Sequence, residues 1–144
     1  MIVLQLISLQ ATYAFASSEI LTQERIFSLS ETPLKKTVTH DAIHDMEAFF
    51  WVMTYICITR QGPGGDRRDD LKPEGNAPKQ LLLTNYYLFS SDEVHDLVHN
   101  KRRMFTMDEC EEYALQVFHP YFNSLKPLMR KWWKILRPVQ SACL

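Results

Sequence analysis

The strongest constraint on the fold is a run from Ala48 to Ile58 in which only one threonine and one tyrosine hydroxyl are polar. Thr39 or Asp41 can cap a helix that we expect to continue to about Thr59. Its apolar side chains recur at steps of three and four, which places one set on a single face: Ile43, Met46, Phe50, Met53 and Cys57. The other faces are apolar too, and such a helix belongs at the centre of a core. We therefore predict a mainly α domain of about five to six helices around a central buried helix at about residues 42–59.

Length, charge and cysteine content narrow the class of protein further. The 144 residues suit one domain, and the formal net charge of −1, with both signs interspersed, indicates no nucleic-acid partner. Away from the termini no segment has the about 20 apolar residues that a membrane span needs, so we expect no membrane partner. Cys57, Cys110 and Cys143 are odd in number and form no CxxC, which argues against a disulfide framework or a zinc site. An intracellular protein, cytoplasmic or nuclear, fits these features best.

The N-terminus permits a second interpretation. Met1 to Leu9 form a short apolar run, and Ala14-Phe15-Ala16 matches the small-x-small pattern that precedes a signal cleavage site. No Lys or Arg precedes the apolar run, although signal peptides usually begin with a positive charge. A signal peptide at residues 1–16 of a small secreted helical protein therefore remains the alternative to an intracellular chain.

Four further helices are expected after the central one. They are predicted at about residues 80–89, 90–104, 106–118 and 124–136. Ser90 with Glu93, and Thr106 with Glu109, form capping boxes for the second and third of these. The last should turn one stripe inward: Leu125, Leu128, Met129, Trp132 and Leu136. The intervening stretch, Arg60 to Lys79, holds all four glycines and a cluster of charges, and we expect a solvated, mobile loop there.

The possible catalytic and metal-binding patterns are incomplete. His40/His44 and His95/His99 are each spaced so that both rings share one helical face, but no third ligand is evident, and solvated surface histidines are the better interpretation. Gly62-Pro63-Gly64-Gly65 lacks the spacing and the lysine of a phosphate-binding loop. We therefore predict no catalytic residue and no metal site in this chain.

One stretch closely resembles a known family. The residues His44-Asp45-Met46-Glu47-Ala48-Phe49-Phe50-Trp51-Val52-Met53, followed by Gly62-Pro63-Gly64-Gly65, are similar to a pattern of the fungal-type protein kinase family. In that family the pattern marks the central helix of the large lobe. The resemblance covers about residues 12–137, which would form part of a kinase C-lobe. Residues 1–11 match nothing in the family, and residues 138–144 would be a tail.

The resemblance implies roles for three residues. Asp45 would be the aspartate that accepts backbone N–H bonds from the catalytic loop, a role that suits an ionised carboxylate. Glu19 would be the glutamate of the Ala-Pro-Glu motif, although Ser17-Ser18 replaces Ala-Pro here. Thr12 would be the threonine of the substrate-facing loop. The arginine that pairs with Glu19 is not readable from the sequence; Arg130 and Arg137 are the candidates.

The family's activity is ATP-dependent phosphorylation of protein serine and threonine, and its machinery is not present in this sequence. Phosphoryl transfer uses a glycine-rich loop, a strand lysine, His-Arg-Asp and Asp-Phe-Gly, none of which occurs here. ATP and Mg²⁺ are therefore expected only for an intact family member, and this chain is predicted to be an inactive fragment or a truncated product. The alternatives are a helical protein-interaction module and a pseudokinase remnant, with the protein partner unknown. The resemblance further implies that Asp45 is exposed or differently paired, and that the face of the helix beside it is partly bare.

Overall fold

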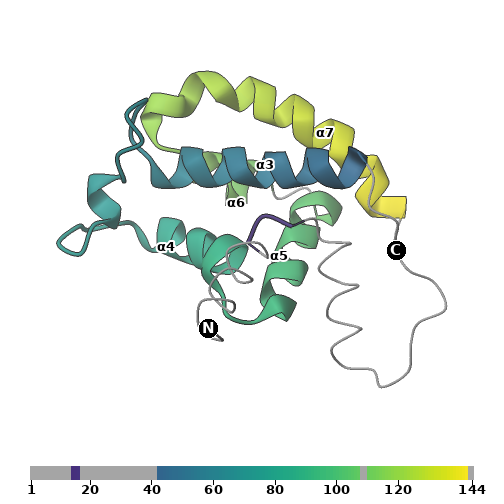
Figure 1. Ribbon diagram of the computed structural model, residues 1–144, viewed down its shortest axis with the longest axis horizontal. Coiled ribbons are helices and arrows are strands. Elements are labelled where there is room, and N and C mark those ends of the chain that lie inside the picture. Colours follow the sequence, from purple (N-terminus) through teal and green to yellow (C-terminus); the bar gives the residue numbers. More distant parts are fainter. Residues whose placement is uncertain (1–13, 17–41, 108–109, 143–144) are drawn as a thin grey trace, which may run out of the picture.

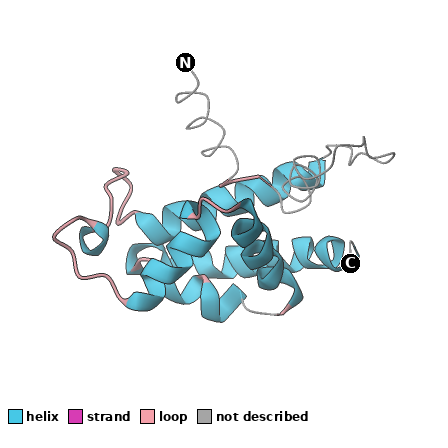
Figure 2. Ribbon diagram, turned by 90° about the horizontal axis from the view of Figure 1, so that it is seen from below, coloured by secondary structure: helices cyan, strands magenta, loops and turns pink. Residues whose placement is uncertain are grey.

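The computed structural model describes residues 14–16, 42–107 and 110–142. Their main helices are α3 (Ala42–Thr59), α4 (Lys79–Asn85), α5 (Val94–Thr106), α6 (Cys110–Tyr113) and α7 (Lys126–Ala142). Shorter elements connect them: 3-10 helices at Asp69–Leu71 (η1), Leu115–Val117 (η3) and Pro120–Leu125 (η4), and a π-helix at Tyr86–Ser90 (η2). Within these ranges no strand forms, apart from an isolated bridge between Arg60 and Arg67. The predicted mainly α fold is confirmed (Figure 2).

The helices pack on two sides of α3. Figure 1 shows α7 running alongside α3 and α4 on the other side of α3, while α5 packs against α7 as well. The shared core contains fully buried side chains from several elements: Phe50, Trp51, Ile58, Leu81, Leu88, Met104, Phe105, Leu115, Met129 and Leu136. None of the described helices is both long and apolar enough to cross a membrane.

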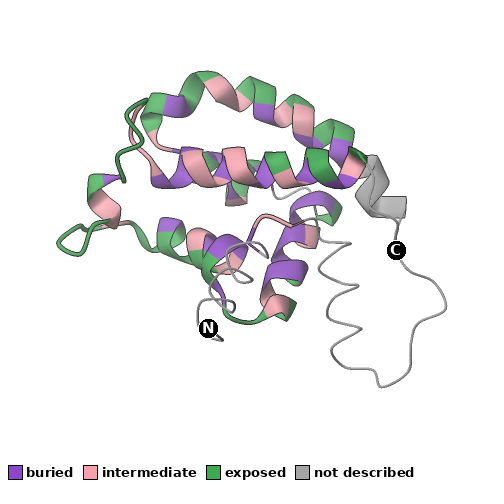
Figure 3. Cartoon of the chain, in the orientation of Figure 1, coloured by how far each residue is buried: buried purple, intermediate pink, exposed green. Residues whose placement is uncertain are grey.

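The predicted helix at about residues 42–59 is confirmed as α3, but not all of its apolar side chains are buried. Met46 is 37% exposed and Phe49 is 64% exposed, whereas Phe50 and Trp51 are fully buried. Figure 3 shows exposed positions on α3 and along α7. The bare apolar positions on α3 agree with the expectation of a partly uncovered helix, and the helix is not buried on every side.

Several polar residues of α3 are buried. Glu47 is fully buried, and its carboxylate accepts a hydrogen bond from the Trp51 indole nitrogen at 3.1 Å. Thr54 is 1% exposed and donates its hydroxyl to the Phe50 carbonyl at 2.8 Å. His44 is 4% exposed, so the prediction of a solvated histidine is wrong at this position. Internal hydrogen bonds make such burial tolerable because they replace those lost with water.

The connection from Arg60 to Lys79 is anchored to the core by Arg68, which is only 9% exposed. Its guanidinium donates to the carbonyls of Ile58 at 3.1 Å and Val117 at 2.7 Å, and it holds Asp70 through two further bonds of 3.0 Å. The prediction that this charge cluster is simply solvated is therefore wrong for Arg68. The segment is an exposed connection with one buried, fully engaged arginine.

The helices after this loop begin and end differently from the predictions. Residues 80–89 are helical as predicted, although their second half is the π-helix η2. The predicted capping box of Ser90 and Glu93 does not form, because Glu93 itself is the N-cap of α5 and has no side-chain cap bond; just before the helix, the Ser91 hydroxyl accepts from the Glu93 amide at 3.2 Å. Thr106 does not cap a following helix but ends α5, where its hydroxyl bonds the Arg102 carbonyl at 3.0 Å.

The predicted helix at residues 106–118 is replaced by two short elements, α6 and η3, and Glu109 lies outside the described residues. The last helix is confirmed and longer than predicted, as α7. Its inward stripe is shifted, because Trp133 is 6% exposed whereas Leu128 is 53% exposed. The Trp133 indole donates to the Met104 carbonyl at 2.6 Å, which fixes α7 against α5.

Candidate functional site

Of the three residues that the resemblance singles out, the structure places Asp45. Thr12 and Glu19 lie outside the described residues. Asp45 lies in the first turn of α3 and is exposed, as predicted. The two candidate partners of Glu19 have other contacts. Arg130 binds the Glu111 carboxylate with its Nε at 2.7 Å, and the Arg137 guanidinium lies over the Trp133 ring at 4.9 Å.

The surface beside Asp45 is apolar. Met46 follows it directly, and Phe49 lies one helical turn further on, on the same side of α3. Phe49 is the most exposed large apolar side chain of this part of the chain, at 64%. An exposed carboxylate next to an exposed aromatic ring offers a hydrogen-bond acceptor and an apolar contact to a packing partner.

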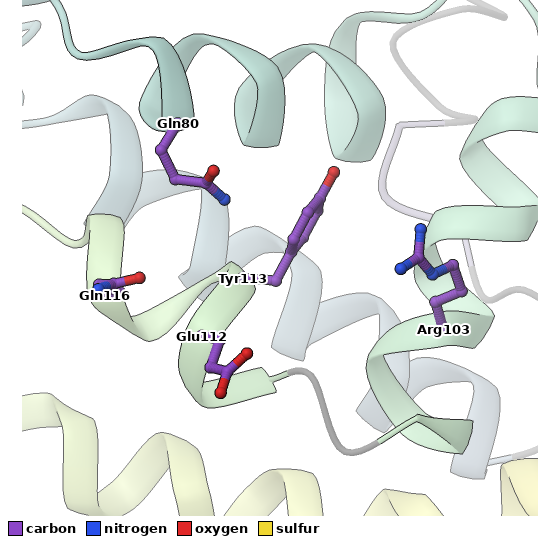
Figure 4. Close-up of a pocket in the computed structure, with 5 residues that line it drawn as sticks. All are labelled: Gln80, Arg103, Glu112, Tyr113 and Gln116. Atoms are coloured by element: carbon purple, nitrogen blue, oxygen red, sulfur yellow. The ribbon is translucent and has the colours of Figure 1, made fainter.

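A polar hollow of about 520 Å³ forms the second candidate site (Figure 4). It is lined by residues of four elements: Gln80, Arg103, Glu112, Tyr113 and Gln116. The Tyr113 ring extends toward α4, and the Arg103 guanidinium lies on the side of the hollow opposite Gln116. Thr84 ties the wall together, because its hydroxyl donates to the Tyr113 carbonyl at 3.0 Å.

The side chains of this hollow suit binding rather than covalent chemistry. Two amides, one phenol, one guanidinium and one carboxylate can donate and accept hydrogen bonds. A Ser or Cys nucleophile is not among the lining residues. The lining residues come from four separate elements, so no local sequence motif predicts the hollow.

A third site centres on Lys101, which is fully buried in α5. Its amine donates to the carbonyls of Ala14 at 2.6 Å and Ala16 at 3.3 Å, and lies 5.3 Å from the centre of the Trp51 ring. Burial lowers the pKa of Lys101 to about 7, an effect that the negative charge of Glu47 partly opposes. The sequence did contain a signal: Lys101 follows the buried Leu97 and Val98 by four and three residues, which places all three on the inward face of α5.

The histidine and cysteine residues do not assemble a metal centre in the part of the chain that the structure describes. No group of three or more His, Cys, Asp or Glu side chains lies close enough to hold a metal ion there. His95 and His99 are exposed as predicted, with ring centres 6.2 Å apart, and His40 lies outside the described residues. Cys57 is a buried core residue, and burial raises the pKa of its thiol to about 11.

Comparison with known proteins adds no relative. No family model, no curated protein and no solved structure matches this chain.

Proposed function

We propose that residues 12–137 are part of the C-terminal lobe of a fungal-type protein kinase domain, and that this chain does not transfer phosphate by itself. The observation that carries the proposal is α3. The stretch with the family resemblance folds as one helix, whose Phe50 and Trp51 are fully buried in the core and whose Asp45 is exposed at its first turn. A strand or a peripheral helix at this position would have removed the support for the resemblance.

Asp45 and Phe49 together support the idea that a further part of a domain packs here. In the family the aspartate accepts backbone N–H groups of the catalytic loop, and hydrogen bonds to an ionised acceptor are stronger than neutral ones. The bare ring of Phe49 lies on the same side of the helix and supplies apolar area for such a contact.

Association with the missing machinery tests the proposal. The chain is titrated, by calorimetry, with a polypeptide that carries the small lobe and catalytic loop of a fungal-type kinase domain. Asp45→Asn keeps the shape and removes the charge, and hydrogen bonds to charged groups contribute about 1.5–3 kcal/mol. Binding should therefore weaken about ten- to a hundredfold, since each tenfold corresponds to about 1.4 kcal/mol.

Glu74→Gln is the matched control, because Glu74 is an exposed carboxylate of the 60–79 connection. This variant should bind as the unmodified chain does. Absence of association, or equal affinity of the Asp45→Asn and unmodified chains, would remove the kinase-lobe proposal.

The inactivity of the chain has its own test. Catalysis of phosphoryl transfer rests on positioning and charge stabilisation by a lysine and Mg²⁺-binding carboxylates, and the motifs that supply them do not occur in this sequence. We expect no Mg²⁺-dependent heat when ATP is titrated into the chain. Clear Mg²⁺-dependent binding would contradict the proposal of an inactive portion.

A helical protein-interaction module is the second candidate function. It is favoured by large apolar side chains that are exposed on two helices: Met46 and Phe49 on α3, and Leu128 and Ile135 on α7. Trp133 is buried and cannot serve as a contact residue. A partner held by this apolar surface would lose affinity on Phe49→Ser and keep it on Asp45→Asn, which separates this candidate from the kinase-lobe proposal.

A further inference from the structure

Residues Ala14–Ala16, the purple segment in Figure 1, pack against side chains of α3, η2 and α5, and we call the site that these side chains form the peptide groove. We define this peptide groove by the residues that contact the segment or hold its contacts in place: Trp51, Tyr55, Phe89, Leu97, Val98 and Lys101. The segment precedes α3 by more than twenty residues in the sequence. Its contacts with the groove are therefore tertiary contacts between distant parts of the chain.

The ring of Phe15 is the central contact of the segment. It meets Tyr55 edge to face, with ring centres 5.4 Å apart and planes at 77°, and it lies 6.0 Å from the Phe89 ring. Tyr55 and Phe89 also pack against each other, at 5.3 Å and 74°, so the two walls of the ring site support one another. Edge-to-face pairs at these distances are favourable beyond the apolar area that they bury.

The residues on either side of Phe15 are alanines, of which Ala14 is buried and Ala16 is partly buried. Ala14 is only 7% exposed. Ala16 packs against a small cluster formed by Leu97 and Val98 on α5. The groove thus favours small residues on both sides of the aromatic ring, most strictly at the buried position of Ala14, where a larger side chain would meet packed atoms.

Lys101 recognises the backbone of the same three residues. Its amine donates to the carbonyls before and after Phe15, on Ala14 and Ala16, at 2.6 and 3.3 Å. Burying an amine is costly unless it is hydrogen-bonded, and the Lys101 amine donates to these two carbonyls while lying beside the Trp51 ring. Backbone carbonyls occur in every peptide, so this contact holds the segment while Phe15 and the alanines provide the selectivity.

We infer that the peptide groove is a binding site for a small–aromatic–small peptide in a turn conformation, and that Ala14-Phe15-Ala16, which forms such a turn, is its built-in ligand. The inference is independent of the kinase-lobe proposal, since it rests only on contacts within this chain. A segment on the same chain is present at high effective concentration, so it occupies the groove ahead of a free peptide of equal intrinsic affinity. Removing the Phe15 ring opens the ring site to a peptide added from outside.

The test uses the full-length chain with Phe15→Ala and a dye-labelled peptide with the sequence of residues 13–17, Tyr-Ala-Phe-Ala-Ser. Binding is followed by fluorescence anisotropy, and the control peptide has alanine in place of its phenylalanine. The phenylalanine peptide should bind the variant at least tenfold more tightly than the control peptide does, and at least tenfold more tightly than it binds the unmodified chain. Adding Lys101→Met to the variant should weaken binding, whereas adding Lys79→Met, which changes an exposed lysine, should not.

Each outcome decides the question. A folded Phe15→Ala chain that binds both peptides equally, or neither, overturns the inference, as does binding of equal strength by the unmodified chain. If circular dichroism shows that Phe15→Ala does not fold, the phenylalanine peptide should restore a cooperative melting transition and the control peptide should not. Failure of that rescue also overturns the inference.

Discussion

The buried amine of Lys101 should make the free energy of unfolding rise with pH above neutrality. Lysine has an ordinary pKa of 10.5, and burial lowers the pKa of Lys101 to about 7. Between these two values the unfolded chain holds a proton that the folded chain has released, so raising the pH favours the folded chain. Below the folded pKa both states are protonated, and the cost of burying the charge is present in full.

The size of the effect follows from the two pKa values. One pKa unit corresponds to about 1.4 kcal/mol, so the difference between the unfolded and folded pKa values of Lys101 corresponds to about 5 kcal/mol in the free energy of unfolding. Between pH 6 and pH 9 the expected increase in the free energy of unfolding from Lys101 is about 3 kcal/mol. That is a large share of the typical stability of a small domain, about 5–15 kcal/mol.

Urea denaturation at a series of pH values measures this increase. Lys101→Met keeps much of the apolar stem and removes the titrating group, so the variant should lack the Lys101 contribution to the pH dependence. The free energy of the unmodified chain minus that of the variant should therefore rise by about 3 kcal/mol from pH 6 to pH 9. Lys79→Met, at an exposed position, should leave the pH dependence unchanged.

A difference between the unmodified chain and Lys101→Met that stays constant with pH would refute the reasoning. It would mean that the amine keeps its proton in the folded chain, with the carboxylate of Glu47 compensating the burial. A difference that falls as the pH rises past 10.5 would show that Lys101 is stabilised as a cation, which is the opposite sign.

Three further substitutions test the packing. Arg68→Met should lower the free energy of unfolding by about 2–4 kcal/mol in urea denaturation, because two buried carbonyls lose a charged donor, whereas Arg67→Met at an exposed position should change it by less than about 0.5 kcal/mol. Similar losses for the two arginines would contradict the anchoring role. Trp133→Phe should cost about 1–3 kcal/mol, read as a lower melting temperature, because the Met104 carbonyl loses its 2.6 Å donor. Phe49→Ser should leave the melting temperature nearly unchanged and reduce light scattering at high salt; a clear loss of stability would show that the ring is packed.

The central helix shows what a local sequence pattern can predict and what it cannot. The apolar run at Ala48–Ile58 predicted α3 with nearly correct ends, because helix formation depends on neighbours three and four residues apart. The pattern did not indicate which side of the helix faces the core, because almost every side is apolar. Neighbouring helices decided this point, and they left Phe49 exposed and enclosed Glu47.

The capping motifs show a second limit. Ser90 and Glu93 match a capping box in spacing, yet Ser90 ends the π-helix η2 and α5 begins only after Glu93, without a side-chain cap. Thr106 and Glu109 match a capping box in spacing, yet α5 continues through Thr106. A capping box can therefore have the right residues at the right spacing without forming in the folded chain.

The amino-acid sequence by itself determined that this chain is mainly helical and that one apolar helix lies in its core, and the family resemblance added that Asp45 in this helix is exposed or differently paired. Only the tertiary structure decided that Lys101 and Arg68 are buried, and that Ala14–Ala16 fill a groove on the helical body. The physical reason is distance along the chain. Helix formation depends on contacts within one turn, which a local sequence pattern can predict. A buried charge is tolerated only where carbonyls from distant segments accept hydrogen bonds from it, and no local sequence pattern predicts those contacts.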